Sequence, residues 1–444
     1  PVTPQTPFRI ASLSKQITAI AARQLIDEGL LRLDATVRDY LPWFGADGSA
    51  VASITVRDLL AHTSGWTTRD GTVTLTEEST DALAIERNVR RLAGTEPTLG
   101  VGTFEYTNAT YDVLGYLVAT VSGTTFEDYV TEHVLDPLEM SHTYLDVASA
   151  KADGLAEGHY RFFGVLASFD PPFSASDLPS AMMMSSAEDL GHLLSAHLAD
   201  GRYGDGRVLS ETSMADIQRP LVEPGLGSGY GWGLWTYPLY EAGGMDADAG
   251  TFAAPLVHEH TGSNSSFASG TILLPQAGYG VVVLLNLNDE VAPSRFYQLH
   301  MGIAMILSGG EAAALTSYDD PLRVYGKAIV LAVLGLQLIG VLIATLRLRR
   351  WMRHPPDGSA TTGWRLRNLV LPLAFDLGAP IALWALYLDA ADLQIIDIPR
   401  AIRLAPDLTL GLIVLAVIGL AWGMARTWLT WRLIRPVGAD PVAA

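Results

Sequence analysis

The chain has 444 residues, of which 49% are hydrophobic and 17% are charged, and its formal net charge is −18. This length predicts two or three structural units with at least one large core. The chain contains no cysteine, which excludes disulfides, thiolate metal sites and a cysteine nucleophile. The acidic balance argues against nucleic acid as a partner, because phosphate binding needs clustered Lys and Arg.

Charge is unevenly distributed along the chain. Residues 321–444 hold 13 of the 29 Lys and Arg but only 7 of the 47 Asp and Glu. The preceding residues are therefore strongly acidic, which is typical of a soluble domain adapted for solubility or for a salty medium. The sequence thus predicts an acidic soluble domain followed by a small, basic and very apolar one.

The first half of the acidic domain is predicted to be mainly helical. Apolar residues recur at three- and four-residue spacing over 11–31, which predicts an amphipathic helix that stops at Gly29. Residues 56–62 form a second short helix by the same criterion. Residues 111–121 and 126–134 are also helical by period.

The second half of the acidic domain adds strands. Ser186, followed by Glu188 and Asp189, resembles a capping box that opens a helix to about Leu198. Residues 271–274 and 280–285 are β-rich runs bounded by Pro, Gly and Asn, which predict adjacent antiparallel strands. A helix over 300–307 and a Gly-Gly linker follow. Helices in the middle and strands at the end predict an α+β layered fold rather than a doubly wound sheet.

Three apolar stretches near the C-terminus predict membrane-spanning helices. They cover 328–346, 369–388 and 408–428, each long enough to cross a hydrocarbon core. Pro372 and Pro380 make the second helix irregular. The link 389–407 contains an amphipathic run over 395–400 that we expect at the outer membrane interface, and the lipid bilayer is therefore an expected partner.

The positive-inside rule gives these spans an orientation. The loop 347–367 between the first two spans is rich in arginine, and the tail holds Arg432 and Arg435. Both segments are therefore expected in the cytoplasm, which places residues 1–320 on the other side of the membrane. Asp376 lies inside the second span and is either a functional residue or a buried or water-facing structural carboxylate.

The first residues of the chain do not resemble a secretory signal. Residues 1–7 have neither a basic start nor an apolar run, whereas an exported domain needs an export signal. We therefore expect the natural protein to begin further upstream.

Ser12 and Lys15 are the first candidates for catalysis. Residues three apart at the start of a helix lie on one face, so the Ser12 hydroxyl can meet the Lys15 amine. A buried, neutral lysine is a competent base for a serine, and a helix N-terminus favours a developing oxyanion. An N-cap serine followed by a surface lysine is the alternative, and the pair alone is a weak signal.

Two further segments add polar groups. Tyr106 beside a lysine could relay a proton, and Asn108 could bind a substrate amide. The segment 260–263, His-Thr-Gly-Ser, is expected at the start of a strand. There His260 could orient a carboxylate or carbonyl, and the N–H of Ser263 could form half of an oxyanion hole. Tyr-x-Asn is common by chance, and the segment 260–263 taken alone would be an ordinary turn before a strand.

Metal and phosphate chemistry are not expected. His258 and His260 share one face of a strand, but no further ligand is evident, so we expect no metal and no cofactor. The glycine-rich segment 225–231 lacks the lysine and the strand-to-helix setting of a phosphate loop. The three methionines 182–184 are expected to pack in the core or a pocket wall.

Five segments in order resemble the family of class C beta-lactamases and D-alanyl-D-alanine carboxypeptidases. They are the Ser-x-x-Lys segment 8–16, the helix end 59–65, the Tyr-x-Asn segment 104–115, the Pro-Leu-Glu-Met turn 136–140 and the His-Thr-Gly segment 260–262. The resemblance covers roughly residues 5–305. It implies an antiparallel sheet flanked by helices, with an additional all-helical domain, before the three transmembrane helices.

The resemblance also implies a role for each matching residue. Ser12 would be the acylated nucleophile, with Lys15 and Tyr106 sharing proton transfer. Asn108 would contact the substrate amide and His260 its carboxylate or carbonyl end.

The remaining implied roles belong to the backbone. Thr261 and Gly262 would line the substrate beside His260, and the N–H groups of Ser12 and Ser263 would form the oxyanion hole. The substrate would be a small molecule or peptide that transfers its acyl group to Ser12.

Two departures from the family pattern qualify the resemblance. Most members have outer strands before the nucleophile segment, whereas Ser12 stands almost at the start of this chain. His260 replaces the lysine of typical beta-lactamases, a substitution also found among the family's peptidases and esterases. It lowers the expectation of an efficient lactamase.

The sequence therefore predicts three parts: a serine hydrolase domain over 1–308, a linker over 309–323 and a three-helix transmembrane module over 324–435. The expected function is hydrolysis of an amide or ester, for instance a D-alanyl peptide or a beta-lactam. An esterase and a catalytically weak membrane receptor for cell-wall fragments or beta-lactams are the alternatives.

Overall fold

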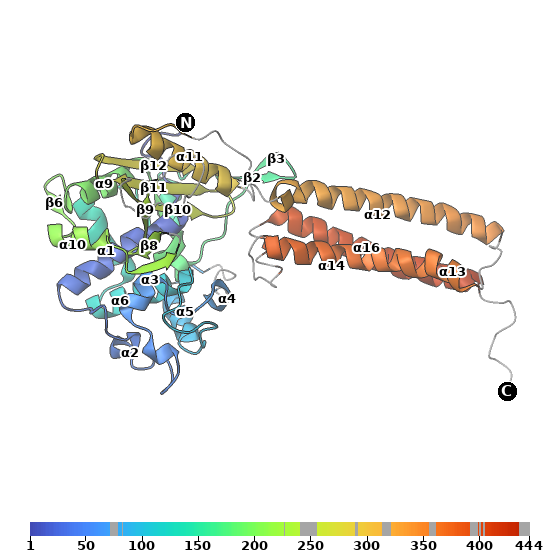
Figure 1. Ribbon diagram of the computed structural model, residues 1–444, viewed down its shortest axis with the longest axis horizontal. Helices are drawn as coiled ribbons and strands as arrows, with labels where there is room; N and C mark the ends of the chain where they lie inside the picture. Colours follow the sequence, from blue (N-terminus) through green and yellow to red (C-terminus); the bar gives the residue numbers. More distant parts are fainter. Residues whose placement is uncertain are drawn as a thin grey trace. The chain divides into compact units, whose positions relative to one another are not determined.

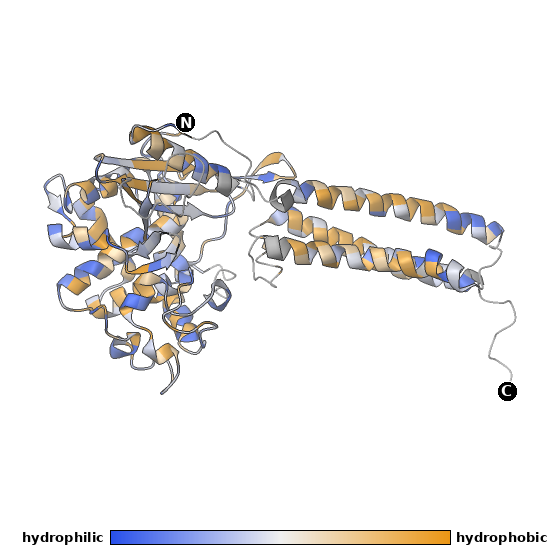
Figure 2. Ribbon diagram, in the orientation of Figure 1, coloured by the Kyte–Doolittle hydropathy of each residue, from blue (hydrophilic) through white to orange (hydrophobic). Residues whose placement is uncertain are grey.

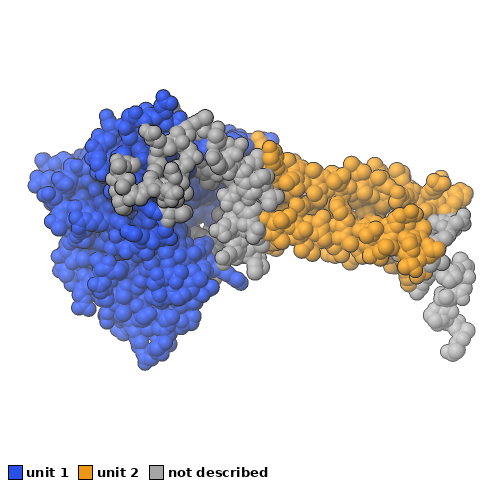
Figure 3. All heavy atoms as spheres, viewed as in Figure 1, with its two compact units in different colours: residues 1–161, 165–318 blue, residues 162–164, 319–444 orange. Residues whose placement is uncertain are grey.

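The chain divides into two compact units (Figure 3). Unit 1 comprises residues 1–161 and 165–318, and unit 2 comprises residues 162–164 and 319–444. The computed structural model describes residues 1–71, 79–81, 83–225, 227–239, 255–288, 292–312, 321–354, 361–390, 398, 401–402 and 405–434.

The centre of unit 1 is a six-stranded antiparallel sheet with strand order β12-β11-β10-β9-β8-β7 (Figure 1). Its strands are β7 (Val222–Gly225), β8 (Ser228–Gly231), β9 (Leu234–Pro238), β10 (Leu256–Ser263), β11 (Ala268–Leu274) and β12 (Tyr279–Leu285). The predicted strands 271–274 and 280–285 thus lie in β11 and β12, and their antiparallel pairing is confirmed.

Shorter strands form three small sheets. These are β1 (Phe8–Arg9) with β4 (Met184–Ser185), β2 (His159–Phe162) with β3 (Val165–Ser168) and β13 (Leu287–Asn288), and β5 (Arg202–Tyr203) with β6 (Gly206–Arg207). The β1–β4 pair is antiparallel and holds the segment just before Ser12 against the segment just after residues 178–182.

Helices cover both faces of the large sheet and form a separate layer beyond it. The α-helices of unit 1 are α1 (Ser14–Asp27), α2 (Val37–Tyr40), α3 (Val56–Ala61), α4 (Thr68–Gly71), α5 (Ala84–Leu92), α6 (Asn108–Ser122), α7 (Phe126–Val130), α8 (Val147–Ala152), α9 (Ala187–Leu198), α10 (Glu211–Ile217) and α11 (Ala292–Leu307). This is the predicted α+β class, an antiparallel sheet flanked by helices with an added helical domain.

The sheet separates two apolar cores. On one face, alternate side chains of the strands, such as Val257 and Ile272, pack against Ala304 and Met305 of α11. On the other face lies the main core, to which α1 contributes a fully buried apolar stripe. Burial of each large aliphatic side chain stabilises such a core by roughly 1.5–3 kcal/mol, so this packing fixes α1 against the sheet.

Helix α1 differs from its prediction at both ends. Residues Ala11–Leu13 form a 3-10 turn before the α-helix begins at Ser14. The α-helix ends at Asp27, and Gly29 follows with a φ of +75°, a conformation that glycine adopts without strain. Gly29 is therefore the stop that the sequence predicted, whereas residues 30–31 lie beyond the helix.

The other predicted helices are present with shifted ends. The helix at 126–134 is α only to Val130 and continues as a π-helical turn over Thr131–Leu135. The helix predicted at 300–307 is the end of α11, which begins at Ala292. In the expected capping box, the Ser186 hydroxyl accepts the backbone N–H of Asp189, but the Asp189 carboxylate accepts from Thr143 instead of closing the box.

In the described part of unit 2, three helices are long and apolar enough to cross a membrane, in agreement with the three predicted apolar stretches (Figure 2). They are α12 (Pro321–Arg353), α14 (Leu371–Ala390) and α16 (Pro406–Ile434), with α13 (Thr362–Arg365) and a π-helical turn (Leu366–Val370) leading into α14. Pro380 lies inside α14, which continues through it. The amphipathic run expected at 395–400 falls almost entirely outside the described residues.

Candidate active site

Ser12 lies in the 3-10 turn between β1 and α1. Its side chain is half-buried, and the preceding Ala11 has a φ of +47°. A residue with a Cβ in this left-handed region costs roughly 1–2 kcal/mol, so the turn is strained just before the candidate nucleophile. The Ser14 hydroxyl, which donates to the Ala11 carbonyl at 2.7 Å, helps to hold the turn.

Lys15 is completely buried beside Ser12. Its Nζ donates to the Ser12 Oγ at 3.2 Å, to the Asn108 Oδ1 at 2.7 Å and to the Ser180 backbone carbonyl at 2.9 Å. These three acceptors come from the 3-10 turn before α1, the start of α6 and the π-helical turn Leu178–Met182. The amine is therefore fixed by three separate parts of the fold.

Burial changes the acid–base behaviour of this amine. Desolvation lowers the pKa of Lys15 to about 7, although the carboxylates of Asp112 and Asp177 act in the opposite direction. A large fraction of the amine is therefore neutral near pH 7 and could accept a proton from Ser12.

Tyr106 lies on the other side of the Ser12 hydroxyl. Its hydroxyl hydrogen-bonds Ser12 and lies 3.4 Å from the Nε2 of His260, and its ring centroid is 4.8 Å from the Lys15 Nζ. Burial, with a smaller contribution from the charge of Glu259, raises the pKa of Tyr106 well above its ordinary value. The hydroxyl therefore stays protonated near neutral pH, which suits a proton relay rather than a tyrosinate base.

His260 is a buried, neutral imidazole. Its Nδ1 lies 2.7 Å from the Thr261 carbonyl oxygen. A carbonyl can only accept, so Nδ1 carries the proton and Nε2 is left as an acceptor facing Tyr106. Burial and the charge of Lys15 lower the pKa of His260 to about 3. His260 therefore brings no positive charge to the site near neutral pH.

The His-Thr-Gly-Ser segment ends strand β10, where the sequence prediction had placed it at the start of a strand. Gly262 packs directly on the turn that holds Ser12. A Cβ at this glycine would collide with the Ile10 carbonyl and the Ser269 hydroxyl, and would lie 3.1 Å from the Ser12 backbone nitrogen. Only glycine lets the strand approach this closely, and the exposed Ser263 follows directly.

His62 is a site residue whose role the sequence did not reveal. It ends α3 with a φ of +55°, and its ring lies 4.4 Å from the ring of Tyr106. Its Nδ1 accepts the backbone N–H of Thr107, so its Nε2 carries the proton and donates to the Tyr230 hydroxyl at 3.1 Å. His62 thus packs against the Tyr106 ring and helps to fix its position. The segment 59–65 was singled out by its resemblance, but nothing in it indicated this contact.

Two buried carboxyl groups beneath Lys15 were also missed. Asp112 is on α6 and Asp177 is in the 3-10 turn Ala175–Asp177, and both are fully buried. Burial, followed by the charge of Asp177, raises the pKa of Asp112 well above its ordinary value. Asp112 therefore holds its proton more tightly than an exposed carboxylic acid does. No local sequence signal marks either residue, because the pair forms only when the chain folds.

The weaker sequence candidates lie outside this cluster. His258 shares a strand face with His260 but hydrogen-bonds Thr236 at 2.9 Å. Within the described residues, no three His, Cys, Asp or Glu side chains converge as metal ligands. Met183 and Met184 are fully buried, in agreement with a packing role.

The structure therefore brings Ser12, Lys15, Tyr106, Asn108 and His260 into one cluster. A hydroxyl in contact with a partly neutral buried amine and a protonated phenol can attack a carbonyl and transfer its proton. Such a site is suited to acyl transfer.

Comparisons with known proteins show which family this chain resembles. A protein-family model described as Beta-lactamase matches residues 1–300. Protein flp of Staphylococcus aureus strain MW2 is 30% identical over 362 residues, which cover 79% of this chain and 66% of that protein. Penicillin-binding protein 4 of Amycolatopsis lactamdurans is 29% identical over 325 residues, covering 69% of this chain and 79% of the relative.

Solved structures share the fold. An octameric penicillin-binding protein homologue from Pyrococcus abyssi has a TM-score of 0.57 at 23% identity, covering 74% of this chain and 71% of its own. A class C beta-lactamase from Rhodobacter sphaeroides has a TM-score of 0.52 at 26% identity, covering 65% of this chain and 82% of its own.

Proposed function

The chain belongs to the beta-lactamase family, and we propose that it is a membrane-anchored serine hydrolase that cleaves an ester or amide through an acyl-enzyme on Ser12. The observation that carries this proposal is the contact between the Ser12 hydroxyl and the buried Lys15 amine, whose pKa falls to about 7. A lysine without a catalytic task is seldom buried in this way, because an ammonium loses its hydration there.

The proposed reaction begins with proton transfer to neutral Lys15. As the Ser12 Oγ attacks the substrate carbonyl carbon, its proton passes to the Lys15 Nζ, and the carbonyl oxygen becomes an oxyanion. The backbone N–H groups of Ser12 and Ser263 would stabilise this oxyanion, a contribution of roughly 2.7–4 kcal/mol per donor in comparable sites.

Collapse of this intermediate breaks the bond to the leaving group. The Tyr106 hydroxyl would pass a proton to the departing oxygen or nitrogen and regain one from the Lys15 ammonium. An ester on Ser12 remains. A water molecule would then attack this ester, with the same groups transferring protons in the reverse sense, and release the acid.

The neutral state of His260 favours substrates without a free carboxylate at this position. D-Alanyl peptides and beta-lactams carry such a carboxylate, and a cationic side chain would strengthen its binding. Since the pKa of His260 falls to about 3, the imidazole is uncharged near neutral pH and contributes only its dipole to substrate binding. We therefore propose esters and neutral amides as the preferred substrates, ahead of the carboxylate-bearing substrates that the family resemblance implies.

A substrate series tests this function. The purified full chain is incubated with a p-nitrophenyl ester, a D-alanyl-D-alanine peptide and a penicillin, with Ser12→Ala in parallel. Ester hydrolysis that disappears in Ser12→Ala supports the proposal. A stable adduct on Ser12 without turnover of any substrate would instead favour a membrane receptor for cell-wall fragments or beta-lactams.

The positive-inside rule supports an active site outside the cytoplasm. Arg347, Arg349, Arg350 and Arg353 end α12, and Arg365 and Arg367 lie just before α14, so this short loop would be cytoplasmic together with the tail after α16. Unit 1 is then on the opposite side of the membrane.

The absence of cysteine makes this orientation easy to test. A single cysteine is introduced either at exposed Glu28 in unit 1 or at exposed Met352 near the loop. In intact cells, a membrane-impermeant maleimide should label Glu28→Cys and spare Met352→Cys. The opposite pattern would invert the orientation.

A further inference from the structure

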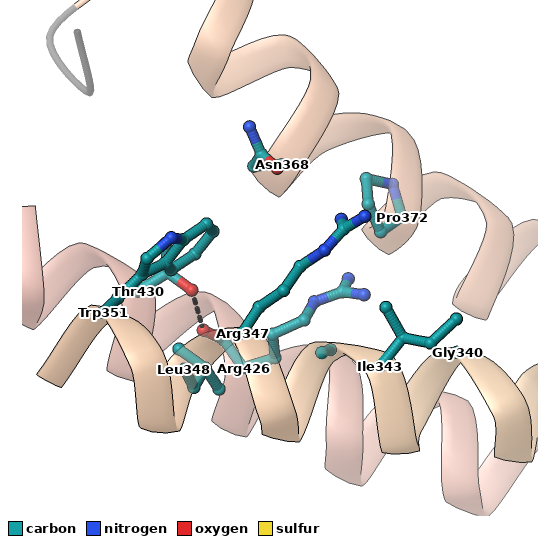
Figure 4. Close-up of a pocket in the computed structure, with 10 residues that line it drawn as sticks. Gly340, Ile343, Arg347, Leu348, Trp351, Asn368, Pro372, Arg426 and Thr430 are labelled. Atoms are coloured by element: carbon teal, nitrogen blue, oxygen red, sulfur yellow. Dashed lines mark hydrogen bonds between the residues drawn. The ribbon is translucent and has the colours of Figure 1, made fainter. Parts of the chain in front are cut away.

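A cavity with a mainly apolar wall and two arginines lies within unit 2, between the end of α12, the start of α14 and the C-terminal part of α16 (Figure 4). Its volume is about 260 Å³. It is lined by Gly340, Ile343, Ala344, Arg347, Leu348, Trp351, Asn368, Pro372, Arg426 and Thr430. The catalytic proposal uses none of these residues.

Arg426 is the most unusual residue in this cavity. It belongs to a helix suited to cross a membrane, and the residue is only 7% exposed. Its Nη2 lies 3.1 Å from the Asp376 Oδ2, but neither its Nε nor its Nη2 makes an aligned hydrogen bond within the described residues. A buried guanidinium with unused donors is costly inside a membrane, and such residues mark functional sites by default.

Close helix packing fixes Asp376 beside Arg426. A Cβ at Gly419 of α16 would collide with the Asp376 backbone carbonyl, and one at Gly423 would lie 2.9 Å from Leu373. These two glycines, four residues apart, let α16 approach α14 closely. The carboxylate is therefore held at the helix crossing and can neutralise only one cation.

Arg347 supplies a second cation. Figure 4 shows the side chains of Arg347 and Arg426 both reaching into the space between the helices. Asp376 pairs with Arg426, and no acidic residue is among the described residues that line the cavity, so these residues leave one positive charge and the donors of two guanidinium groups. An Asp376–Arg426 ion pair that merely joined α14 to α16 would not need Arg347. This pattern is suited to an anion with several acceptor oxygens.

The level of the cavity in the membrane indicates which anion is available to it. Trp351 lines the cavity and contacts Trp364 in a tilted arrangement with ring centroids 5.1 Å apart, and Arg432 lies over the ring of Trp428 at 5.4 Å. Tryptophan and arginine near helix ends lie at the level of the lipid headgroups. The abundant anion at that level is the lipid phosphate. The volume also lies below the roughly 300–1,000 Å³ of pockets that enclose a drug-sized ligand, which suits a headgroup.

We propose that the Arg347–Arg426 cavity is a binding site for a phosphate group, and that this phosphate belongs to the headgroup of an anionic membrane lipid. The two guanidinium groups bind the phosphate oxygens, while the acyl chains remain in the surrounding bilayer. This site is independent of the chemistry at Ser12, so its test does not depend on the proposed function.

Lipid retention by the full chain tests this site. The protein is equilibrated in detergent with equal amounts of phosphatidylglycerol and phosphatidylcholine, and bound lipid is counted by native mass spectrometry. The wild type should retain phosphatidylglycerol in preference to phosphatidylcholine. Arg347→Gln should lower that retention about fivefold, the effect expected for loss of one basic contact at a membrane surface.

Arg349→Gln is the matched control, since Arg349 belongs to the same exposed end of α12 but does not line the cavity. It should leave the preference unchanged.

The double variant Asp376→Asn with Arg426→Gln removes both charges of the ion pair together, and it should lose the preference while the chain stays folded. Equal losses in Arg347→Gln and Arg349→Gln, or no preference in the wild type, would overturn the site. Displacement of phosphatidylglycerol by equimolar inorganic phosphate would overturn the lipid as its source.

Discussion

The Lys15 Nζ lies 3.2 Å from the Ser12 Oγ and makes its two other hydrogen bonds to neutral oxygens, on Asn108 and Ser180. Lys151 in the same unit is different, because it is exposed and pairs with Asp170 at 2.8 Å. One lysine is thus an ordinary surface cation, whereas the other is kept from its usual charge by burial. This contrast underlies the first prediction.

The rate of Ser12 acylation should rise with pH and level off above about pH 7. Burial lowers the pKa of Lys15 to about 7, so the amine is protonated and inactive below that value and neutral above it. The measurement is the rate of fluorophosphonate labelling between pH 5 and 9. His260 does not titrate in this range, because its pKa is about 3. Lys15→Arg, which keeps a permanent charge, should lose at least about 100-fold in rate.

Lys151→Arg is the control for this experiment and should follow the wild-type curve. A labelling rate that rises only around the ordinary lysine pKa, or that does not depend on pH, would contradict the assigned role of Lys15.

Substitution of His260 by Lys should change substrate preference. The lysine would bring a cation to a position that is neutral in the wild type, so the ratio of kcat/KM for a penicillin to that for a p-nitrophenyl ester should rise about tenfold or more. His258→Gln, on the same strand face but hydrogen-bonded to Thr236, should leave the ratio unchanged. An unchanged ratio in His260→Lys would show that this position does not select for a carboxylate.

Gly115 of α6 should not tolerate a methyl group. A Cβ there would collide with the ring of Pro179, in the turn whose Ser180 carbonyl accepts from Lys15. We expect Gly115→Ala to lower the free energy of unfolding of unit 1 by about 1–3 kcal/mol and to slow acylation of Ser12. Gly191→Ala is a matched control in α9, where the methyl group meets open space and should stabilise the helix by roughly 0.5–1 kcal/mol. Equal effects of the two substitutions would exclude the steric explanation.

Glu139 should be replaceable by glycine with a gain in stability. It ends the 3-10 turn Asp136–Leu138 and has a φ of +53° although it is exposed. Relief of a left-handed conformation is worth about 1–2 kcal/mol, and the greater freedom of glycine in the unfolded chain offsets part of this. Thermal unfolding should show a higher midpoint for Glu139→Gly. The neighbouring Ser141→Gly should show a lower one, and a lower midpoint for both would contradict the account.

Short sequence patterns predicted much of the fold, because they reflect hydrophobic periodicity and the backbone preferences of single residues. The stop at Gly29, the antiparallel pair β11–β12 and the three apolar helices all follow from periodicity or from residues with special backbone preferences. The π-helical turn after Val130 was missed, since its helical period does not differ visibly from that of α-helix over five residues.

The candidate site was predicted only where its residues belong to short motifs. Ser12 and Lys15 are three residues apart, so their contact follows from helix geometry. The contacts of Lys15 with Ser180 and of His62 with Tyr106 join distant segments, and no single-sequence pattern reports them. The charge state of His260 likewise depends on burial and on the Thr261 carbonyl, which appear only in the folded chain.

The most direct test of the acyl-enzyme proposal is the intact mass of the protein after incubation with a fluorophosphonate, compared between the wild type and Ser12→Ala. We predict a single adduct on the wild type and none on the variant, because the contact with Lys15 activates Ser12 alone. An adduct of equal yield on folded Ser12→Ala, or no adduct on the folded wild type, would contradict the proposal.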